Sequence, residues 1–273
     1  MLFNRLKSFF VLIIVLLSVS ILLVLNSRTE EPKAPIVSIP KQEPIEPIVE
    51  EITRGHIIII IDDFGYRNDE VSEGFLTLDA DLTFAVIPGH KNSKLFSERA
   101  DKSGYEIIIH MPMESTADTH GELDYILAES MTSSEIEQRV EKVISEFPEA
   151  AGLNNHQGSK ATADKRIMNI VSNVLKRHGR YFVDSRTTSE TVAEDIMRSR
   201  GVPTARRHVF LDNDDDINKI RNQLYKLVDK AESKGDAIGI GHVKKLTLQV
   251  LKEEIPKLKK NGFKFQFASF VVK

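Results

Sequence analysis

Residues 56–65 read HIIIIIDDFG, in which five consecutive isoleucines run directly into two aspartates. A β-branched run without polar alternation is typical of a parallel strand that is buried on both faces. In folds made of parallel strands, functional residues gather just past the carboxyl ends of the strands. The stretch therefore predicts a central strand over residues 57–61 and a candidate site that begins with Asp62 and Asp63.

Downstream of Gly55, short apolar runs alternate with amphipathic runs of helical length. We expect strands at 57–61, 82–87, 105–109, 150–153, 180–183, 204–211, 237–240 and 263–268. Thr132 and Glu135 have the spacing of a capping box that opens a helix. The alternation predicts an α/β fold, an irregular (β/α) barrel of seven or eight parallel strands that need not close completely. A doubly wound open sheet is the alternative.

Composition limits the classes of partner and of chemistry. The 273 residues are 41% hydrophobic and 28% charged, with a formal net charge of -3. Nucleic-acid binders usually carry a basic stripe, so we exclude a nucleic-acid partner. The chain has no cysteine, which excludes disulfides and thiolate ligands. Any metal ion must therefore be held by His, Asp or Glu.

The N-terminus predicts a membrane anchor. Arg5 and Lys7 precede an apolar run over residues 9–25, and about 17–25 such residues are needed to cross a bilayer. The run ends without a small-x-small cleavage site, so we expect an uncleaved signal-anchor, a transmembrane helix, within residues 1–28. The basic flank favours an inner-membrane anchor with the folded part outside the cytoplasm, in a periplasm or cell-wall space. If the leader were cleaved, the protein would be secreted.

Residues 29–54 are expected to form a linker. They contain Pro32, Pro35, Pro40, Pro44 and Pro47, half of the prolines in the chain. Such composition is typical of an extended polyproline-type spacer. The folded domain is therefore expected to occupy residues 55–273.

Polar residues follow six of the predicted strands. They are Asp62, Asp63, His110, Asn154, Asn155, His156, Asp184, Ser185, Arg186, Asp212, Asn213 and His242. An Asp after a strand is commonly a helix N-cap, and Asp212 opens the acidic run DNDDD, which suits capping of the next helix. Three histidines and two aspartates at one barrel face nevertheless predict a site. Two His and one carboxylate suit a catalytic divalent ion such as zinc, and one carboxylate and one imidazole remain as base and acid.

Six sequence blocks, in order, resemble one known family. They are IDDFG (61–65), HMPME (110–114), GLNNHQGSKAT (152–162), FVDSRT (182–187), RRHVFLDN (206–213) and GIGH (239–242). They look like the divergent polysaccharide deacetylase family, which is related to the NodB-type carbohydrate esterases. The resemblance runs from about Gly55 to the C-terminus and implies a NodB-like barrel with a deacetylase-like catalytic domain at 55–273.

The resemblance also implies a metal site. It makes Asp63 and His110 ligands of a divalent ion, with zinc expected. The relatives take a second histidine from an H-x-x-x-H segment, where this chain has Glu114. We expect His156 to be the third ligand and Glu114 to support the site or contact substrate, with Glu114 as the alternative ligand.

By the same resemblance, Asp62 is the catalytic base and His242 the general acid. We expect Asp184 to hold the useful tautomer of His242, Arg186 or Arg206 to orient Asp62, and two asparagines to bond sugar hydroxyls. The residues expected to bind substrate are Asn154, Asn155, Glu114, Arg186 and Arg206.

The implied activity is removal of N-acetyl groups from an envelope glycan such as peptidoglycan. Two alternatives stay open at this point. One is a catalytically silent glycan-binding or scaffolding protein, which the glutamate at position 114 favours. The other is a metal hydrolase of a different ester or amide, because a fold does not fix the chemistry.

Overall fold

The computed structural model describes residues 2–26, 53–117 and 121–273. The chain divides into two units, residues 1–49 and 50–273. In the first unit, helix α1 (Leu2–Asn26) is continuous, with side chains described from Ile13 onward. Within the described ranges no helix is long and apolar enough to cross a membrane, so the expected transmembrane span is not confirmed. The predicted linker at 29–54 lies outside the described residues except for its last two.

The second unit is built on a sheet whose strand pairs are all parallel. Its strands are β1 (Gly55–Phe64), β2 (Thr83–Val86), β3 (Glu106–Met113), β4 (Gly152–Gln157), β5 (Tyr181–Asp184), β6 (Thr204–Arg206), β7 (Val209–Phe210), β8 (Asp236–His242) and β9 (Phe263–Gln266). Eight of them follow the order β6-β5-β4-β3-β2-β1-β8-β7, and β9 pairs with β1. The path ends at β6 and β7, so the sheet is a curled half-barrel. The predicted parallel α/β fold is confirmed, in its open form.

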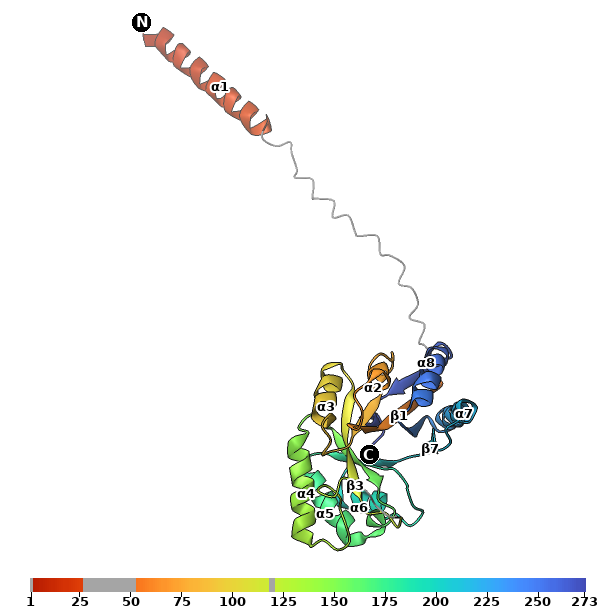
Figure 1. The fold of residues 1–273 in the computed structure, drawn as a ribbon. Coiled ribbons are helices and arrows are strands. Elements are labelled where there is room, and N and C mark those ends of the chain that lie inside the picture. Colours follow the sequence, from red (N-terminus) through yellow and green to blue (C-terminus); the bar gives the residue numbers. More distant parts are fainter. Residues whose placement is uncertain (1, 27–52, 118–120) are drawn as a thin grey trace. The chain divides into compact units, whose positions relative to one another are not determined.

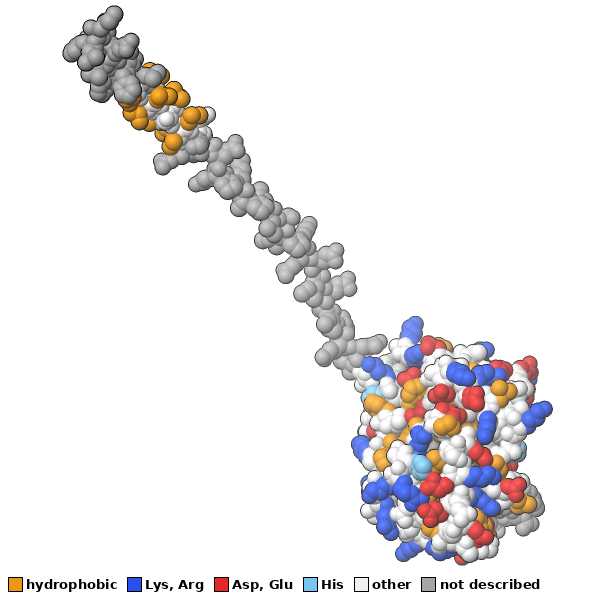
Figure 2. All heavy atoms as spheres, turned by 90° about the vertical axis from the view of Figure 1, so that its left-hand side faces the viewer, with side chains coloured by type: hydrophobic (Ala, Val, Ile, Leu, Met, Phe, Trp, Pro, Cys, Tyr) orange, Lys and Arg blue, Asp and Glu red, His pale blue; other side chains and the backbone are white. Residues whose placement is uncertain are grey.

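Helices cover the outer face of this sheet (Figure 1). They are α2 (Glu70–Phe75), α3 (Ser93–Lys102), α4 (Ser133–Glu146), α5 (Lys165–Arg177), α6 (Ala193–Arg200), α7 (Ile217–Lys234) and α8 (Lys245–Lys260), with 3₁₀ turns at Ala161–Ala163 and Ala268–Phe270. The predicted capping box of Thr132 and Glu135 opens α4. In the face of the molecule that Figure 2 presents, acidic and basic side chains are interspersed, as is usual for a solvated surface.

The isoleucine run of β1 is buried on both faces, with all five side chains 0% exposed. Ile57, Ile59 and Ile61 belong to a core cluster that also contains buried side chains of helices α2 to α8. Ile58 and Ile60 belong to a second cluster, formed by strand residues and the C-terminal segment around Ala268. Helices therefore pack on one face only, which rules out the doubly wound alternative. Each such burial contributes about 1.5–3 kcal/mol.

At its carboxyl end β1 is distorted where the two aspartates lie. Its register with β2 shifts between Ile61 and Phe64, and Asp63 has a left-handed φ of 71°. Phe64 is held firmly just beyond, because its ring stacks on Phe96 with centroids 4.0 Å apart. A non-glycine residue held in this conformation costs about 1–3 kcal/mol and commonly marks a functional site.

Candidate functional site

The inner face of the half-barrel carries the predicted site residues. Side chains two residues apart point to the same face of a strand, so Asp62 follows Ile58 and Ile60 on the inner face of β1. His110 likewise follows Ile108 on β3, and His242 follows Ile240 on β8. The register pairs Asp62 with His242 on adjacent strands. With His156 of β4, they line one cleft of about 380 Å³.

Asp63, His110 and His156 form a cluster that could hold a metal ion. One ligand atom from each lies within 4.8 Å of the others. Asp63 Oδ1 is 3.4 Å from both His110 Nε2 and His156 Nδ1, and the two ring nitrogens are 3.0 Å apart. Asp63 Oδ1 is buried without a hydrogen-bond partner, which is costly unless another ligand satisfies it. Two imidazoles and a carboxylate therefore fit a divalent ion, with zinc among the ions that favour this donor set.

The pKa values in this cluster reflect its mixed charge. Burial alone would raise the pKa of Asp63, but the nearby imidazoles of His110 and His156 hold it far below the ordinary range. Burial lowers the pKa of His110, and the carboxylates of Asp62 and Asp63 outweigh that effect and raise it to about 9. Burial raises the pKa of Asp62. Of the two adjacent aspartates, Asp62 is therefore the better proton acceptor.

Asn154 connects the base to the metal cluster. Its Nδ2 donates to Asp62 Oδ1 at 2.8 Å, so its Oδ1 is left to accept from His110 Nδ1 at 2.7 Å. This bond selects the His110 tautomer whose Nε2 faces Asp63, a common arrangement around metal-binding histidines. Asn154 is 0% exposed, and both ends of its amide are engaged within the fold. In this structure it positions Asp62 and His110, and its contact with a sugar hydroxyl stays a prediction.

His242 is held by Asp212, which is fully buried. Asp212 Oδ1 is 2.8 Å from His242 Nδ1, and Oδ2 accepts from His242 N at 2.7 Å and Thr247 Oγ1 at 2.6 Å. Burial lowers the pKa of His242, but the bond to Asp212 reverses the effect and raises it. With Nδ1 engaged, Nε2 is the nitrogen left for the cleft.

The expected role of Asp184 is therefore corrected. Its carboxylate accepts from Arg186 N and Thr191 Oγ1, both at 2.8 Å. It lies on the same face of β5 as Phe182, which belongs to the helix-covered core. The sequence suggested that Asp212 serves only to cap the next helix, whereas the residue that caps α7 is Asp216. One sequence feature could have identified Asp212 as a site residue. It directly follows the apolar residue Leu211 at a predicted strand end, unlike the later acids of the run DNDDD.

The two arginine predictions have different outcomes. Arg186 lines the cleft. Arg206 instead is exposed and lies 3.5 Å from Glu194, and its neighbour Arg207, which the sequence analysis missed, lines the cleft. Arg207 donates from Nε to Ser185 O at 2.6 Å and from Nη2 to Arg186 O at 2.9 Å.

Glu114 and Asn155 serve the surrounding loops. Glu114 pairs with Lys160 at 2.8 Å and accepts from Glu129 N at 2.7 Å. Glu114 is not part of the candidate metal cluster, which contains His156. The structure therefore favours His156 over Glu114 as the third ligand. Asn155 borders the cleft, but its amide is used within the fold, accepting from Ser185 N and donating to Gln157 O.

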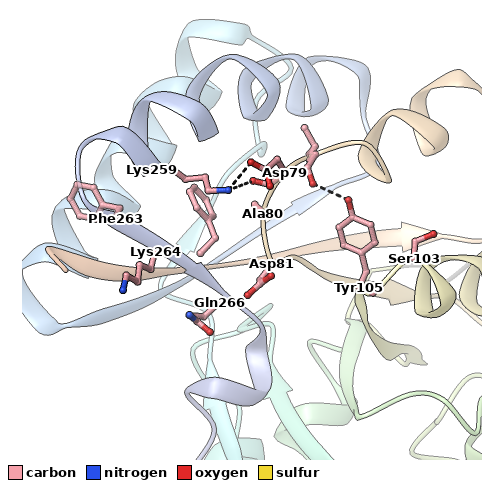
Figure 3. A pocket seen from close by; sticks show the side chains of 12 residues that line it. Asp79, Ala80, Asp81, Ser103, Tyr105, Lys259, Phe263, Lys264 and Gln266 are labelled. Atoms are coloured by element: carbon pink, nitrogen blue, oxygen red, sulfur yellow. Dashed lines mark hydrogen bonds and ion pairs between the residues drawn. The ribbon is translucent and has the colours of Figure 1, made fainter. Parts of the chain in front are cut away.

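A larger hollow of about 560 Å³ lies at the opposite, amino end of the strands (Figure 3). Its charged groups are partly paired with one another, since Lys259 Nζ is 2.8 Å from Asp79 Oδ2. Tyr105 donates to Leu78 O. It contains no histidine and no metal-ligand cluster among the described residues. The smaller cleft at the carboxyl ends is therefore the better candidate site.

Comparison with known proteins identifies the family of this chain. A profile described as divergent polysaccharide deacetylase matches residues 59–272. Over 204 residues the chain is 34% identical to a protein of Escherichia coli K12 named as uncharacterized protein YibQ, covering 75% of this chain and 63% of that one. The chain thus spans less than two thirds of that relative. It belongs to the divergent polysaccharide deacetylase family.

Solved structures agree on the fold. An uncharacterized protein from Agrobacterium tumefaciens C58 superposes with a TM-score of 0.76 at 18% identity, covering 80% of this chain and 89% of that one. The Xyl-CE4 domain of a multidomain xylanase from the hindgut metagenome of Trinervitermes trinervoides gives a TM-score of 0.51 at 14% identity, covering 79% and 88%. The fold is therefore related to that of the CE4, or NodB-type, deacetylases.

Proposed function

We propose that this protein is a metal-dependent deacetylase that removes N-acetyl groups from a cell-envelope polysaccharide such as peptidoglycan. One observation carries the proposal: a candidate base, Asp62, and a candidate acid, His242, flank the Asp63–His110–His156 cluster in a single cleft. Hydrolysis of an amide needs these three functions together, namely activated water, a proton acceptor and a proton donor.

The residues divide the reaction between them. A divalent ion held by Asp63, His110 and His156, with zinc proposed, would act as a Lewis acid on the acyl carbonyl and on water. Asp62 Oδ1 is engaged by Asn154, so Oδ2 takes the proton of the attacking water. His242 Nε2 gives its proton to the departing sugar amine, while Asp212 stabilises the imidazolium through Nδ1.

Acetate release tests this function. The full-length chain, purified in mild detergent and loaded with zinc, is incubated with N-acetylated peptidoglycan strands or chitin oligosaccharides. We expect release that a chelator abolishes and added zinc restores. Absence of release from folded, zinc-loaded protein on every N-acetylated glycan would overturn the proposal.

A silent glycan-binding or scaffolding protein is the second candidate. The observation that favours it is Glu114, which stands where the relatives have a histidine ligand and is engaged by Lys160. This candidate predicts that the protein binds the glycans of the acetate-release assay and releases no acetate from them.

We also propose that the folded unit lies outside the cytoplasm, tethered by the N-terminal segment. Support comes from the basic residues Arg5 and Lys7 before the apolar run and from the exposed apolar side chains of α1, among them Leu22 at 70%. A C-terminal alkaline phosphatase fusion should be active in cells, and membrane fractionation should retain it. An inactive, cytoplasmic fusion would contradict the location, and a soluble exported one would indicate a cleaved leader.

A further inference from the structure

Two arginines line the candidate cleft beside Asp62 and His242, and neither makes an ion pair within the described residues. Arg186 follows β5 with a left-handed φ of 53°, and its backbone N donates to Asp184. Arg207 is fixed by two backbone carbonyls, and its guanidinium lies over the Phe210 ring, 4.8 Å from the centroid. Arg206, one residue earlier, turns instead to Glu194.

Arg207 is pre-organised and has unused donors. A guanidinium has five N–H groups, and the bonds to Ser185 O and Arg186 O use Nε and Nη2. Nη1 has no protein acceptor among the bonds of the described residues. A partly buried cation with free donors and a fixed orientation is well suited to bind an anion that arrives in the cleft.

The charge balance of the cleft points the same way. Asp212 balances protonated His242. The charges of Asp62 and Asp184 act on Arg207, and the charge of Asp184 acts on Arg186, but both oxygens of Asp184 already accept hydrogen bonds. Within the described residues, neither guanidinium therefore has a carboxylate at ion-pair distance.

We propose that the glycan substrate carries a carboxylate close to its acylated sugar, and that Arg186 and Arg207 bind this carboxylate. The inference rests on the proposed glycan function and narrows it to acidic polymers. A neutral polymer would leave both guanidinium groups without a directly bound counter-ion in the occupied cleft, which is unfavourable once water is displaced. A lactyl ether or a uronic acid would supply the same carboxylate.

Equilibrium binding tests the proposal without relying on turnover. The probes are N-acetylated oligosaccharides of equal length that are neutral, that carry lactyl ether carboxylates, or that carry uronic acid carboxylates. They are titrated into the zinc-loaded full-length chain by calorimetry. We expect at least one acidic probe to bind about 10- to 100-fold more tightly than the neutral one, the effect of a charge-assisted hydrogen bond. The difference should shrink as salt increases.

Variants connect the preference to the two arginines. Arg207→Gln and Arg186→Gln should each reduce the ratio of acidic to neutral affinity by about tenfold or more. Arg186→Gln keeps the backbone bond to Asp184, so it decides the matter if Arg207→Gln fails to fold. Arg206→Gln is the matched control and should keep the full ratio. Equal affinity for acidic and neutral probes, or an equal loss in the Arg206→Gln control, would overturn the inference.

The result is separable from the deacetylase proposal. Preferential binding of an acidic probe without acetate release would contradict the proposed activity and support the charge inference. Acetate release with equal affinity for all probes would support the activity and contradict the inference.

Discussion

Asp62 and Asp63 are adjacent in sequence and differ in every physical respect that matters for catalysis. Asp62 continues the strand, accepts a bond from Asn154 and has its pKa raised by burial. Asp63 has a left-handed backbone and an unpaired Oδ1, and its pKa is held low by two histidines. Neighbouring carboxylates with pKa values pushed apart commonly divide the roles of base and permanent anion.

Substitution should separate these two roles. Asp62→Asn is expected to retain zinc and lose acetate release, because it removes the proton acceptor and leaves the ligands. His156→Ala is expected to lower zinc affinity by more than the 10- to 100-fold typical of losing a supporting residue. Zinc content and titration measure both. His178→Ala, an exposed histidine paired with Glu141, is the control, and full zinc occupancy in His156→Ala would refute the ligand assignment.

Asp212→Asn should abolish most activity while the fold and the zinc persist. The amide cannot stabilise imidazolium at His242 Nδ1 and favours the wrong tautomer, so we expect kcat to fall about 10⁴-fold. Acetate release measures the loss. Asp214→Asn, at an exposed acid paired with Lys219, should behave as wild type, and activity retained in Asp212→Asn would return the orienting role to another residue.

Sequence patterns located the site more accurately than they assigned its supporting residues. Strand ends identified the candidate metal cluster because parallel strands bring their carboxyl ends together. The acidic run after Asp212 suggested a helix cap, and position after a strand then favoured Asp184, although the two-residue period places Asp184 with Phe182 on the helix-covered face. Arg206 and Arg207 are adjacent, and only the loop conformation decides which of them enters the cleft.

At the scale of elements, β1 was predictable and the region of residues 204–211 was not. The predicted single strand is two short strands, β6 and β7, interrupted at Arg207 and His208. His208 N donates to Ile238 O, and its ring Nδ1 accepts from Ile238 N at 2.9 Å. The His208 side chain thus accepts a hydrogen bond that a backbone carbonyl would otherwise accept in the sheet. Hydropathy patterns give no sign of this exchange.

Helices α7 and α8 are joined through a buried carboxylate, Glu254. It accepts from Arg221 and Lys257, each at 3.0 Å, and from Tyr225 Oη at 2.8 Å. Burial would raise the pKa of Glu254, but these bonds lower it below the ordinary 4.5. Its stabilising effect is therefore present above about pH 4.5 and is lost as the pH falls through the folded-state pKa.

Glu254→Gln should lower the free energy of unfolding at pH 7 by about 2 kcal/mol. The loss should shrink toward pH 3, where the wild-type carboxylate is protonated as well. Urea unfolding at several pH values measures both. Glu253→Gln, more exposed and on the same helix, should cost much less than Glu254→Gln. A pH-independent difference for Glu254→Gln would contradict the assigned ionic role.

At the scale of the whole molecule, the second unit should fold alone. A fragment of residues 50–273 is expected to keep the far-UV circular dichroism and zinc content of the full chain, because its sheet and helices pack with one another. A fragment of residues 66–273 lacks β1, which pairs with β2, β8 and β9, and should not fold. Equal folding of both fragments would contradict the central place of β1.

The overall class of fold followed from local patterns, whereas its closure did not. Each strand and helix shows its own periodicity, and parallel connection follows from their alternation. Whether the ends of the sheet meet depends on β6 and β7, which are three and two residues long. Such short edges carry almost no pattern of their own.

The left-handed backbone of Asp63 implies a trade-off between stability and activity. An L-residue in this conformation costs stability that a glycine would not, by about 1–2 kcal/mol. In metal-free protein, Asp63→Gly should therefore unfold at higher denaturant concentration than Asp63→Ala. By the same argument, metal-free Asp63→Gly should be more stable than the metal-free wild type. Zinc should reverse this order of stability, because only the wild type has the carboxylate ligand that couples metal affinity to folding. Without a metal, glycine would thus be the more stabilising residue at position 63, and aspartate there contributes to stability only when a metal ion is bound.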